Sequence, residues 1–284
     1  MKYILAISGG VDSVVLLHMI ARRRILTDAV FPDDFVVAHF DHGVRGADST
    51  HDAEFVRDLA ASYGVEFVLG RAKLSPNCSE ELARKKRYEF LYSNDNEDVL
   101  VTAHHADDLL ETILINLIRG TGWRGLAPMQ NVRVVRPLLY MTKVEIVQYA
   151  IDNGLEWVED ITNFSPNYFR NRLRDLTYKM SPETRTEMMN LYRKQRILRE
   201  EIENILGDMS SDGEIIIDRD FLRDLPESVA MEVLRTATNG KLTRPQMERT
   251  IKFATTAKPA KKMQYKHVDI SVTKKTISVI KYFA

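Results

Sequence analysis

The sequence is almost free of cysteine, with Cys78 the only one among 284 residues. A single cysteine excludes an internal disulfide framework and a zinc site held by several cysteines, and it fits a reducing compartment. No apolar run reaches the roughly 20 residues that cross a bilayer. The N-terminus also lacks the basic segment and small-residue cleavage site of a signal peptide. We therefore expect a cytoplasmic protein with no membrane span.

Net charge is also absent, since 40 basic residues balance 40 acidic ones, but the two signs are unevenly distributed. Residues 1–167 hold 17 Lys and Arg against 24 Asp and Glu, a net of −7, whereas residues 168–284 hold 23 against 16, a net of +7. From Gly240 onward, 11 basic residues accompany 2 acidic ones. A basic C-terminal region is typical of a protein that binds a polyanion, although a solvated lysine-rich surface accounts equally well for the excess.

The first half of the chain alternates short apolar runs with stretches of helical periodicity. The predicted strands are Lys2–Ile7, Phe35–Phe40, Glu66–Leu69 and Val99–Thr102. The predicted helices are Asp12–Arg24, Asp48–Tyr63, Ser79–Tyr92 (capped by Ser79, with Leu82 facing inward) and Asp107–Arg119. This alternation predicts an α/β fold, an open, mainly parallel sheet with helices on both faces.

The pattern changes past about Trp157. Glu183–Leu206 reads as one long charged helix with a narrow apolar stripe, either a linker within the chain or the seam of a homodimer. A short strand (Glu214–Asp218), two helices (Pro226–Thr238 and Thr243–Thr255) and alternating C-terminal residues then predict a small α+β unit. We expect three parts: a catalytic domain over residues 1–182, a linker helix over 183–207 and a small α+β domain over 208–284.

The stretch Ser8-Gly9-Gly10-Val11-Asp12-Ser13 stands where the first strand passes into the first helix. Backbone N–H groups at a helix N-terminus form an anion site, and glycines let the backbone approach a phosphate. A carboxylate beside phosphates is repulsive unless a cation lies between them, so Asp12 indicates Mg²⁺. The alternative is that Asp12 merely caps the helix.

Further polar residues follow the second and fourth predicted strands. Asp41 and His42 are either a wall of a nucleotide site or plain turn residues. Asp108 and Glu111, three residues apart, lie on one helical face, where two carboxylates can hold a cationic amine and accept its proton. His104 and His105 lack the spacing of zinc ligands, and one of them is as readily a buried, satisfied histidine. Asp107 is expected to point elsewhere, as a helix cap.

Ser8–Ser13 resembles the SGGxDS signature of the ATP pyrophosphatase (PP-loop) family, whose loop holds the pyrophosphate of ATP. Several later stretches, in this order and spacing, resemble the tRNA(Ile)-lysidine synthetases within that family. They are "HFDHGVRGADS" (39–49), "ELARKKRY" (81–88), "TAHHADDLLET" (102–112), "RGTGWRGL" (119–126), "RPLL" (136–139), "WVEDITNFSPNYFRNRLR" (157–174) and, more loosely, "FLRDLPESVAMEVLR" (221–235). The resemblance implies an adenine nucleotide alpha hydrolase-like fold.

The resemblance also implies a reaction. ATP adenylylates the C2 carbonyl oxygen of the wobble cytidine of tRNA(Ile), and free L-lysine then displaces AMP to give lysidine. The implied site residues fall into three sets. The catalytic residues are Asp12, Arg84, His104, Asp108 and Glu111. ATP binds at Ser8, Gly9, Gly10, Asp12, Ser13, His39, Asp41 and His105, with Mg²⁺ on Asp12. Lysine binds at Asp108, Glu111 and Arg174, while Asn163 and Asn171 match orienting positions.

Basic residues complete the predicted site. Arg84 and Arg87 are suited to ATP or tRNA phosphates. Arg170 and Arg172 stand near two aromatic residues, a composition that suits phosphate contact and base stacking. In the C-terminal tail, Lys258, Lys261 and Lys262, with Lys274 and Lys275, are candidate contacts to the tRNA backbone. A solvated basic surface is the alternative for each set.

Three other functions compete with lysidine formation. A tRNA thiolase of the same family needs cysteines for sulfur transfer or an iron–sulfur cluster, and a single cysteine argues against it. A glutamine-dependent synthetase for small molecules leaves the basic C-terminus unexplained. A non-catalytic RNA-binding module does not require Asp12, Asp108 and Glu111.

Overall fold

A computed structural model describes residues 2–24, 35–43, 47–72, 78, 80–92, 98–131, 133–158, 169–206 and 214–282. The chain forms two compact units, residues 1–193 and 194–284, and each is described by itself. Helix α7 (Pro182–Leu206) begins in the first unit and ends in the second. Among the described residues, no helix combines the length and the apolar character needed to cross a membrane.

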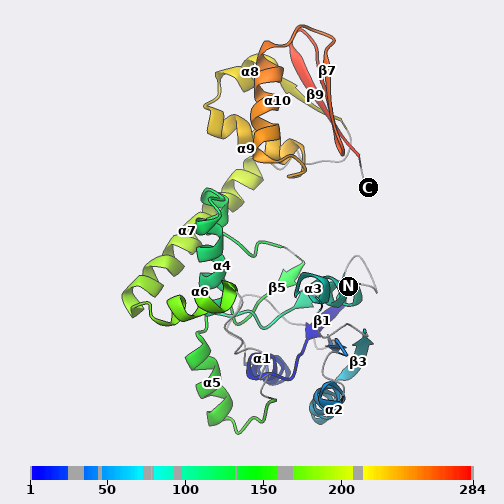
Figure 1. The fold of residues 1–284 in the computed structure, drawn as a ribbon, viewed down its shortest axis with the longest axis vertical. Helices are drawn as coiled ribbons and strands as arrows, with labels where there is room; N and C mark the ends of the chain where they lie inside the picture. Colours follow the sequence, from blue (N-terminus) through cyan, green and yellow to red (C-terminus); the bar gives the residue numbers. More distant parts are fainter. Residues whose placement is uncertain are drawn as a thin grey trace. The chain divides into compact units, whose positions relative to one another are not determined.

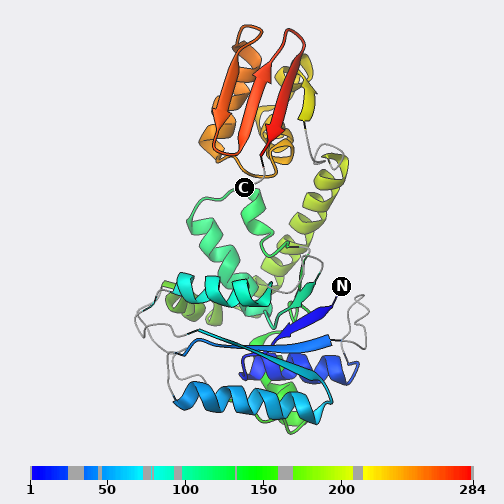
Figure 2. The ribbon, with the colours of Figure 1, turned by 90° about the vertical axis from the view of Figure 1, so that its right-hand side faces the viewer.

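The first unit is built on a five-stranded parallel sheet in the order β3-β2-β1-β4-β5 (Figure 2). Its strands are β1 (Tyr3–Ala6), β2 (Phe35–Asp41), β3 (Glu66–Arg71), β4 (Val99–Val101) and β5 (Val134–Val135). The chain moves from β1 outward to β3, then returns to the other side of β1 with β4. The gap between β1 and β4 is therefore the topological switch point, where ligands of open α/β sheets bind.

Helices cover both faces of this sheet (Figure 1). Leu5, Val37 and Val101 share a core with α1 (Val11–Ala21), α2 (Ala47–Ser62) and α5 (Lys143–Asp152). The alternate residues Ile4, Ala38 and Leu100 share a core with α3 (Glu80–Leu91). Successive side chains of a strand point to opposite faces, so this division confirms the predicted two-sided α/β fold. The remaining elements of the unit are α4 (Ala106–Ile118), the 3-10 helix η1 (Trp123–Leu126) and α6 (Phe169–Tyr178).

One packing prediction for α3 is wrong. Leu82 was expected to face inward, but it is 42% exposed. The helix meets the sheet through its C-terminal half, where Leu91 is buried and Tyr88 and Phe90 pack beside it. The expected cap, Ser79, lies outside the described residues.

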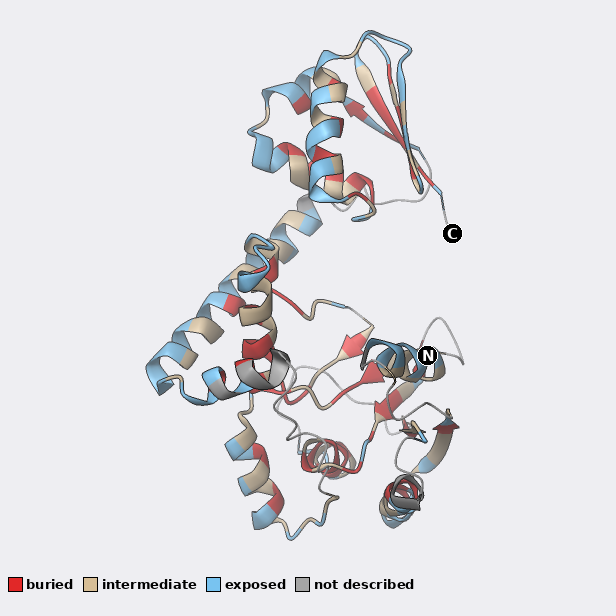
Figure 3. Ribbon diagram, in the orientation of Figure 1, coloured by how far each residue is buried: buried red, intermediate tan, exposed pale blue. Residues whose placement is uncertain are grey.

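The second unit contains an antiparallel sheet in the order β6-β9-β8-β7, and three helices cover one face of it. The elements are β6 (Glu214–Asp218), α8 (Arg219–Asp224), α9 (Glu227–Ala237), α10 (Arg244–Thr256), β7 (Lys262–Tyr265), β8 (Val268–Val272) and β9 (Thr276–Lys281). Buried faces of the helices point toward the sheet, as Figure 3 shows. This arrangement confirms the predicted small α+β unit.

Helix α7 carries the expected apolar stripe, but the stripe is only partly covered. In the first unit, Met188 and Met189 pack with buried Tyr192 against Leu109 and Ile113 of α4. Three other stripe residues are largely exposed: Leu191 (41%), Ile197 (52%) and Leu198 (43%).

Candidate functional site

The turn from β1 to α1 requires glycine at position 9, and at Gly10 it leaves the backbone open to close approach by a ligand. Gly9 has φ +94°, a conformation that L side chains rarely adopt, and its carbonyl accepts the backbone N–H of Val158 (3.0 Å). Gly10 has an ordinary φ of −71°, and a Cβ there would meet only the Ser8 hydroxyl, at 3.7 Å. The backbone conformation therefore explains Gly9, whereas Gly10 leaves open space above the start of α1.

The two serines of this turn hold the loop together. The Ser13 hydroxyl accepts the backbone N–H groups of Ser8 (3.2 Å) and Gly9 (3.1 Å) and donates to the Gly10 carbonyl (2.9 Å). The Ser8 and Ser13 hydroxyl oxygens lie 3.2 Å apart. The hydroxyls of these two predicted ATP-binding residues are thus already engaged within the loop. The start of α1, where Gly10 is the N-cap and has no side chain to occupy the backbone donors, remains the feature suited to the predicted phosphate.

Residues at the carboxyl end of β2 stand beside this turn because β2 pairs in parallel with β1. His39 is buried, and its Nδ1 is 2.8 Å from the Ile7 carbonyl oxygen. Burial lowers the pKa of His39 against the raising effect of that bond and of Asp41 and Asp52, which favours the neutral ring. The Asp41 carboxylate accepts the backbone N–H of Gly43 (2.8 Å), as a turn residue would.

Two histidines follow β4, on the other side of β1, and their environments differ. Burial lowers the pKa of His104 to about 4, although Asp108 acts in the opposite direction, and its Nδ1 lies 2.7 Å from the Thr102 hydroxyl. His105 is also buried, yet the carboxylates of Asp107, Asp108 and Asp12 raise its pKa. A neutral imidazole and a readily protonated one therefore stand side by side at the edge of the sheet.

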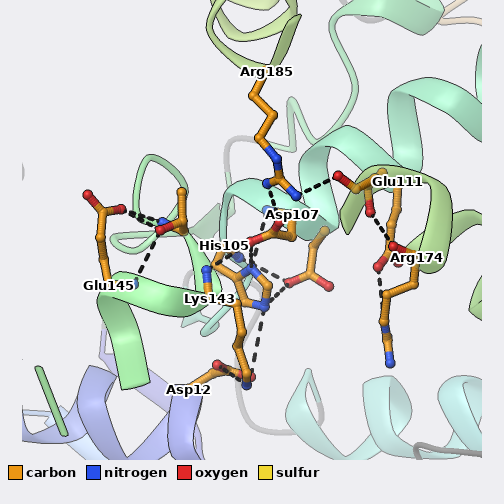
Figure 4. Close-up of polar contacts among 11 residues, drawn as sticks. Asp12, His105, Asp107, Glu111, Lys143, Glu145, Arg174 and Arg185 are labelled. Atoms are coloured by element: carbon orange, nitrogen blue, oxygen red, sulfur yellow. Dashed lines mark hydrogen bonds and ion pairs between the residues drawn. The ribbon is translucent and has the colours of Figure 1, made fainter. Parts of the chain in front are cut away.

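His105 connects the glycine turn to α4 (Figure 4). Its Nδ1 accepts the backbone N–H of Asp107 (3.3 Å), and its Nε2 faces two carboxylates, at 3.5 Å from Asp108 Oδ2 and 3.9 Å from Asp12 Oδ2. Asp108 also accepts the backbone N–H of His105 (3.0 Å), which completes a capping box. His105, with Asp108 as its capping-box partner, therefore caps α4 in place of the expected Asp107.

Glu111 lies one turn further along α4 and is almost fully buried, at 1% exposure. Its Oε1 accepts a bond of 3.0 Å from Nε of Arg174 on α6, whose side chain is 45% exposed. The sequence grouped Glu111 and Arg174 as ligands of one amino acid, and the structure brings them into direct contact. Because a buried carboxylate needs a partner, Arg174 also compensates the charge of Glu111.

Two cations that the sequence did not single out enter the site. Lys143, the first residue of α5, donates from Nζ to Asp12 Oδ1 (2.6 Å), and its backbone N–H donates to Asp107 Oδ2 (2.8 Å). Arg185 of α7 donates to Asp107 Oδ1 (2.5 Å) and to the Thr177 carbonyl (2.5 Å). Against the effect of burial, the interaction with His105 and the two bonds from Arg185 and Lys143 hold the pKa of Asp107 well below its usual range. Asp107 thus joins α4, α5 and α7.

Arginines of α3 face the His104 side of the site. The guanidinium of Arg84 lies 4.8 Å from the ring centre of Tyr88 and that of Arg87 lies 5.7 Å from it. The positive charges of Arg136, Arg84 and Arg87 help to lower the pKa of His104. Their field reaches the histidine, so this flank of the site favours anions.

The remaining predicted contacts are described only in part. Asn163 lies outside the described residues, as do the side chains of Arg170, Asn171 and Arg172 on α6. In the second unit, Ala260 N–H bonds the Val272 carbonyl and Val272 N–H bonds the Lys261 carbonyl, so the α10–β7 and β8–β9 connections lie side by side. This pairing gathers five exposed lysines at one end of the unit: Lys258, Lys261, Lys262, Lys274 and Lys275.

Within the part of the chain that the structure describes, no group of three or more His, Cys, Asp or Glu side chains is arranged to hold a metal ion. Asp12, whose side chain is 30% exposed, still suits Mg²⁺ that arrives with phosphates. Mg²⁺ is commonly bound through one or two carboxylates plus substrate phosphates and water. The donor set therefore fits a magnesium–nucleotide complex rather than a protein-only metal site.

Comparisons with known proteins agree with this geometry. A profile of the PP-loop domain matches residues 1–180. The chain is 33% identical over 248 residues to the tRNA(Ile)-lysidine synthase of Solibacter usitatus, covering 81% of this chain and 55% of that protein. It is 39% identical over 184 residues to that of Thermosipho africanus, covering 61% and 42%. The chain spans about half the length of the curated relatives it matches.

Among solved structures, the chain resembles a U34-tRNA thiolase from Methanococcus maripaludis, which carries a [4Fe-4S] cluster. The TM-score is 0.57 at 19% identity, covering 70% of this chain and 73% of that one. A likeness at this identity supports the fold alone.

Proposed function

Because this chain belongs to the PP-loop domain family, we propose that it is an ATP-dependent ligase of tRNA. It joins free lysine to C2 of the wobble cytidine of tRNA(Ile) with the anticodon CAU, giving lysidine, AMP and pyrophosphate. Its curated relatives are named tRNA(Ile)-lysidine synthase, which supports this choice among the reactions of the family.

One observation carries the proposal, namely the contact of a single imidazole with both halves of the site. His105 Nε2 lies 3.9 Å from Asp12 of the glycine turn and 3.5 Å from Asp108 of α4. A phosphate on that turn and an amine on the α4 carboxylates would therefore sit next to each other. Ligation of an amine through an adenylylated intermediate requires this proximity.

In the first step, the C2 carbonyl oxygen of cytidine attacks the α-phosphorus of ATP, and the bond to pyrophosphate breaks. The start of α1 binds the phosphates through backbone N–H groups, and Arg84 supplies positive charge for the charge that develops on them. Asp12 would hold Mg²⁺ between itself and the phosphates, and the ion would neutralise that charge when bound.

In the second step, the lysine nitrogen attacks C2, and the C2–O bond breaks so that AMP leaves with the former carbonyl oxygen. Asp108 and Glu111 hold the cationic amine and accept the proton that it must lose. Arg174, with an exposed guanidinium beside Glu111, is suited to the carboxylate of the amino acid. Neutral His104 is available to hydrogen-bond the base.

The runner-up activity, tRNA thiolation, shares the fold but not the residues. Iron–sulfur clusters are held by several cysteine thiolates, and Cys78 is the only cysteine of this sequence. A non-catalytic RNA-binding module would in turn have no use for a protonatable histidine placed between two carboxylates.

The test is incubation of the protein with ATP, Mg²⁺, lysine and tRNA(Ile), followed by pyrophosphate measurement and mass spectrometry of the tRNA. We expect pyrophosphate release that depends on tRNA, and a mass gain of one lysine minus one water at the wobble cytidine. The control is the same tRNA with uridine at the wobble position, which should gain no mass. An unmodified wobble cytidine with active ATP turnover would contradict the proposal.

A further inference from the structure

The glycine turn that would receive a triphosphate contains an acidic side chain and no basic one. Residues 8–13 include Asp12 but neither lysine nor arginine. Phosphate loops of the other common type carry a lysine within the loop itself, which contacts the terminal phosphates. Within the turn itself, only the partial charges of the helix N-terminus offset Asp12 and the phosphates.

A lysine reaches this turn from another part of the chain. Lys143 lies 131 residues after Asp12 in the sequence, and its ammonium donates to Asp12 Oδ1 at 2.6 Å (Figure 4). The main chain of Lys143 is fixed, because its N–H bonds Asp107 Oδ2 (2.8 Å). Its side chain is 40% exposed. The ammonium is thus held near the turn on a flexible stem that a ligand can redirect.

The start of α5 does not itself offer an anion site. The Thr142 hydroxyl accepts the N–H of Glu145 (3.2 Å), and Glu145 Oε2 accepts the N–H and hydroxyl of Thr142 (2.7 and 2.8 Å). This capping box uses the donors that a helix terminus would otherwise present. Any contribution of α5 to phosphate binding must therefore come from the Lys143 side chain.

We propose that Lys143 is the phosphate-binding cation of this site, supplied in place of the lysine that the glycine turn lacks. Without nucleotide, its ammonium neutralises Asp12. With ATP bound, the ammonium turns to the β- and γ-phosphates, and both oxygens of Asp12 become free for Mg²⁺. The inference rests on the proposed function, since it assigns a ligand to the same turn.

The rival explanation is that Lys143 only ties α5 to α1. These helices already share a core, and Tyr149 of α5 bonds His18 of α1 (3.0 Å). A tie of that kind would affect the folding free energy, and its loss would weaken the binding of every nucleotide equally. A phosphate contact instead affects only ligands that carry the outer phosphates, so comparison of two nucleotides separates the two roles.

The experiment is calorimetric titration of the wild type, Lys143→Gln and Lys143→Arg with ATP, AMP and pyrophosphate. AMP lacks the outer phosphates. We expect Lys143→Gln to bind ATP and pyrophosphate about 10- to 100-fold more weakly, the equivalent of one charge-assisted hydrogen bond, with AMP binding unchanged. Lys143→Arg should recover most of the loss. Lys85→Gln, on the exposed surface of α3, is the matched control and should bind as the wild type does.

Two results would overturn the inference: unchanged ATP binding by Lys143→Gln, or equal loss of ATP and AMP. Thermal unfolding shows whether each variant is folded. If Lys143→Gln is not folded, Lys143→Arg remains as the variant that keeps the positive charge. A wild-type protein that binds no ATP would instead refute the proposed function, and this inference with it.

Discussion

Asp12 is the residue on which the proposed use of ATP depends most directly. Its carboxylate faces Lys143 and His105, and its side chain is 30% exposed. We predict that Asp12→Ala lowers pyrophosphate release by at least about 100-fold, the usual cost of removing one preorganised electrostatic group. Asp58→Ala, on the exposed side of α2, is the control. Substantial turnover with an unchanged dependence on Mg²⁺ would argue against metal binding at Asp12.

Glu111 should matter for lysine rather than for ATP. Glu111→Gln keeps the shape of the side chain but removes the negative charge that faces Arg174. We predict that lysine transfer slows by about 100-fold or more, as for the loss of a general base, while adenylylation changes little. The measurement is pyrophosphate release without lysine, compared with lysidine formation when lysine is added. Equal losses in both steps would contradict this role, and Glu54→Gln on α2 serves as the control.

His104 makes the stability of the fold depend on pH. Burial lowers its pKa to about 4 in the folded chain, against about 6.5 when unfolded. The unfolded state binds more protons between these values, so the histidine destabilises the fold progressively as pH falls from about 6.5 to about 4. We predict that protonation of this group lowers the free energy of unfolding by about 2 kcal/mol by about pH 5. Urea unfolding at about pH 7.5 and pH 5 should show a smaller acid-induced loss for His104→Gln than for the wild type, and equal losses would refute the assignment.

At the scale of helices and strands, Asp107 acts as a junction between three helices. It bonds the start of α5 and Arg185 of α7, and both charged side chains are largely buried, at 12% and 20% exposure. We predict that Asp107→Asn lowers the free energy of unfolding by about 3 kcal/mol, because Arg185 loses its counter-charge.

A double-mutant cycle with Arg185→Gln checks this prediction. It should give a coupling energy of about 1–3 kcal/mol. The exposed pair Arg244 and Glu248 on α10 is the control, for which we expect less than about 1 kcal/mol. A coupling at Asp107 no larger than at the control would mean that the junction contributes little.

The sequence predicted elements well where local periodicity decides them. The first four strands and helices and α7 lie within a few residues of their expected bounds, because alternation and helical spacing are properties of neighbouring residues. Helix α8 was missed because it has only six residues. Asp218 caps it locally, and tertiary bonds hold it in place, because the Arg219 guanidinium donates to the carbonyls of Ala254, Ala257 and Thr273. Leu82 was misplaced because periodicity does not say which end of a helix meets the sheet.

The residues of the candidate site likewise fall into those that a local motif identifies and those that only a long-range contact identifies. Gly9, Asp12, Asp108 and Glu111 could be found because each belongs to a short motif with its own chemistry. Lys143 could not, because its partner Asp12 stands 131 residues earlier and no local pattern encodes that pairing. Arg185 likewise lies in a helix whose many charges look alike in the sequence. The structure therefore adds mainly the long-range ion pairs.

At the scale of the whole molecule, the charge asymmetry of the sequence becomes a localised surface. Five lysines, on two neighbouring connections and at the start of β7, lie at one end of the second unit, although in the sequence they form two groups: Lys258, Lys261, Lys262, Lys274 and Lys275. Clustered ammonium groups on exposed connections bind phosphates without reading bases. The two units would then divide the work, with chemistry in the first and tRNA backbone contact in the second.

This division predicts how tRNA binding responds to salt. Replacing Lys258, Lys261 and Lys262 by glutamine should weaken tRNA binding and reduce the slope of log K against log salt by about 2 to 3, since each phosphate contact contributes about 0.7 to 0.9. The loss should be similar for an unrelated tRNA, because these contacts carry no sequence information. Lys85→Gln with Lys86→Gln on α3 tests whether any loss of surface charge has the same effect. An unchanged slope in the triple variant would move the tRNA-binding surface to the first unit, where Arg84 and Arg87 would be the next candidates.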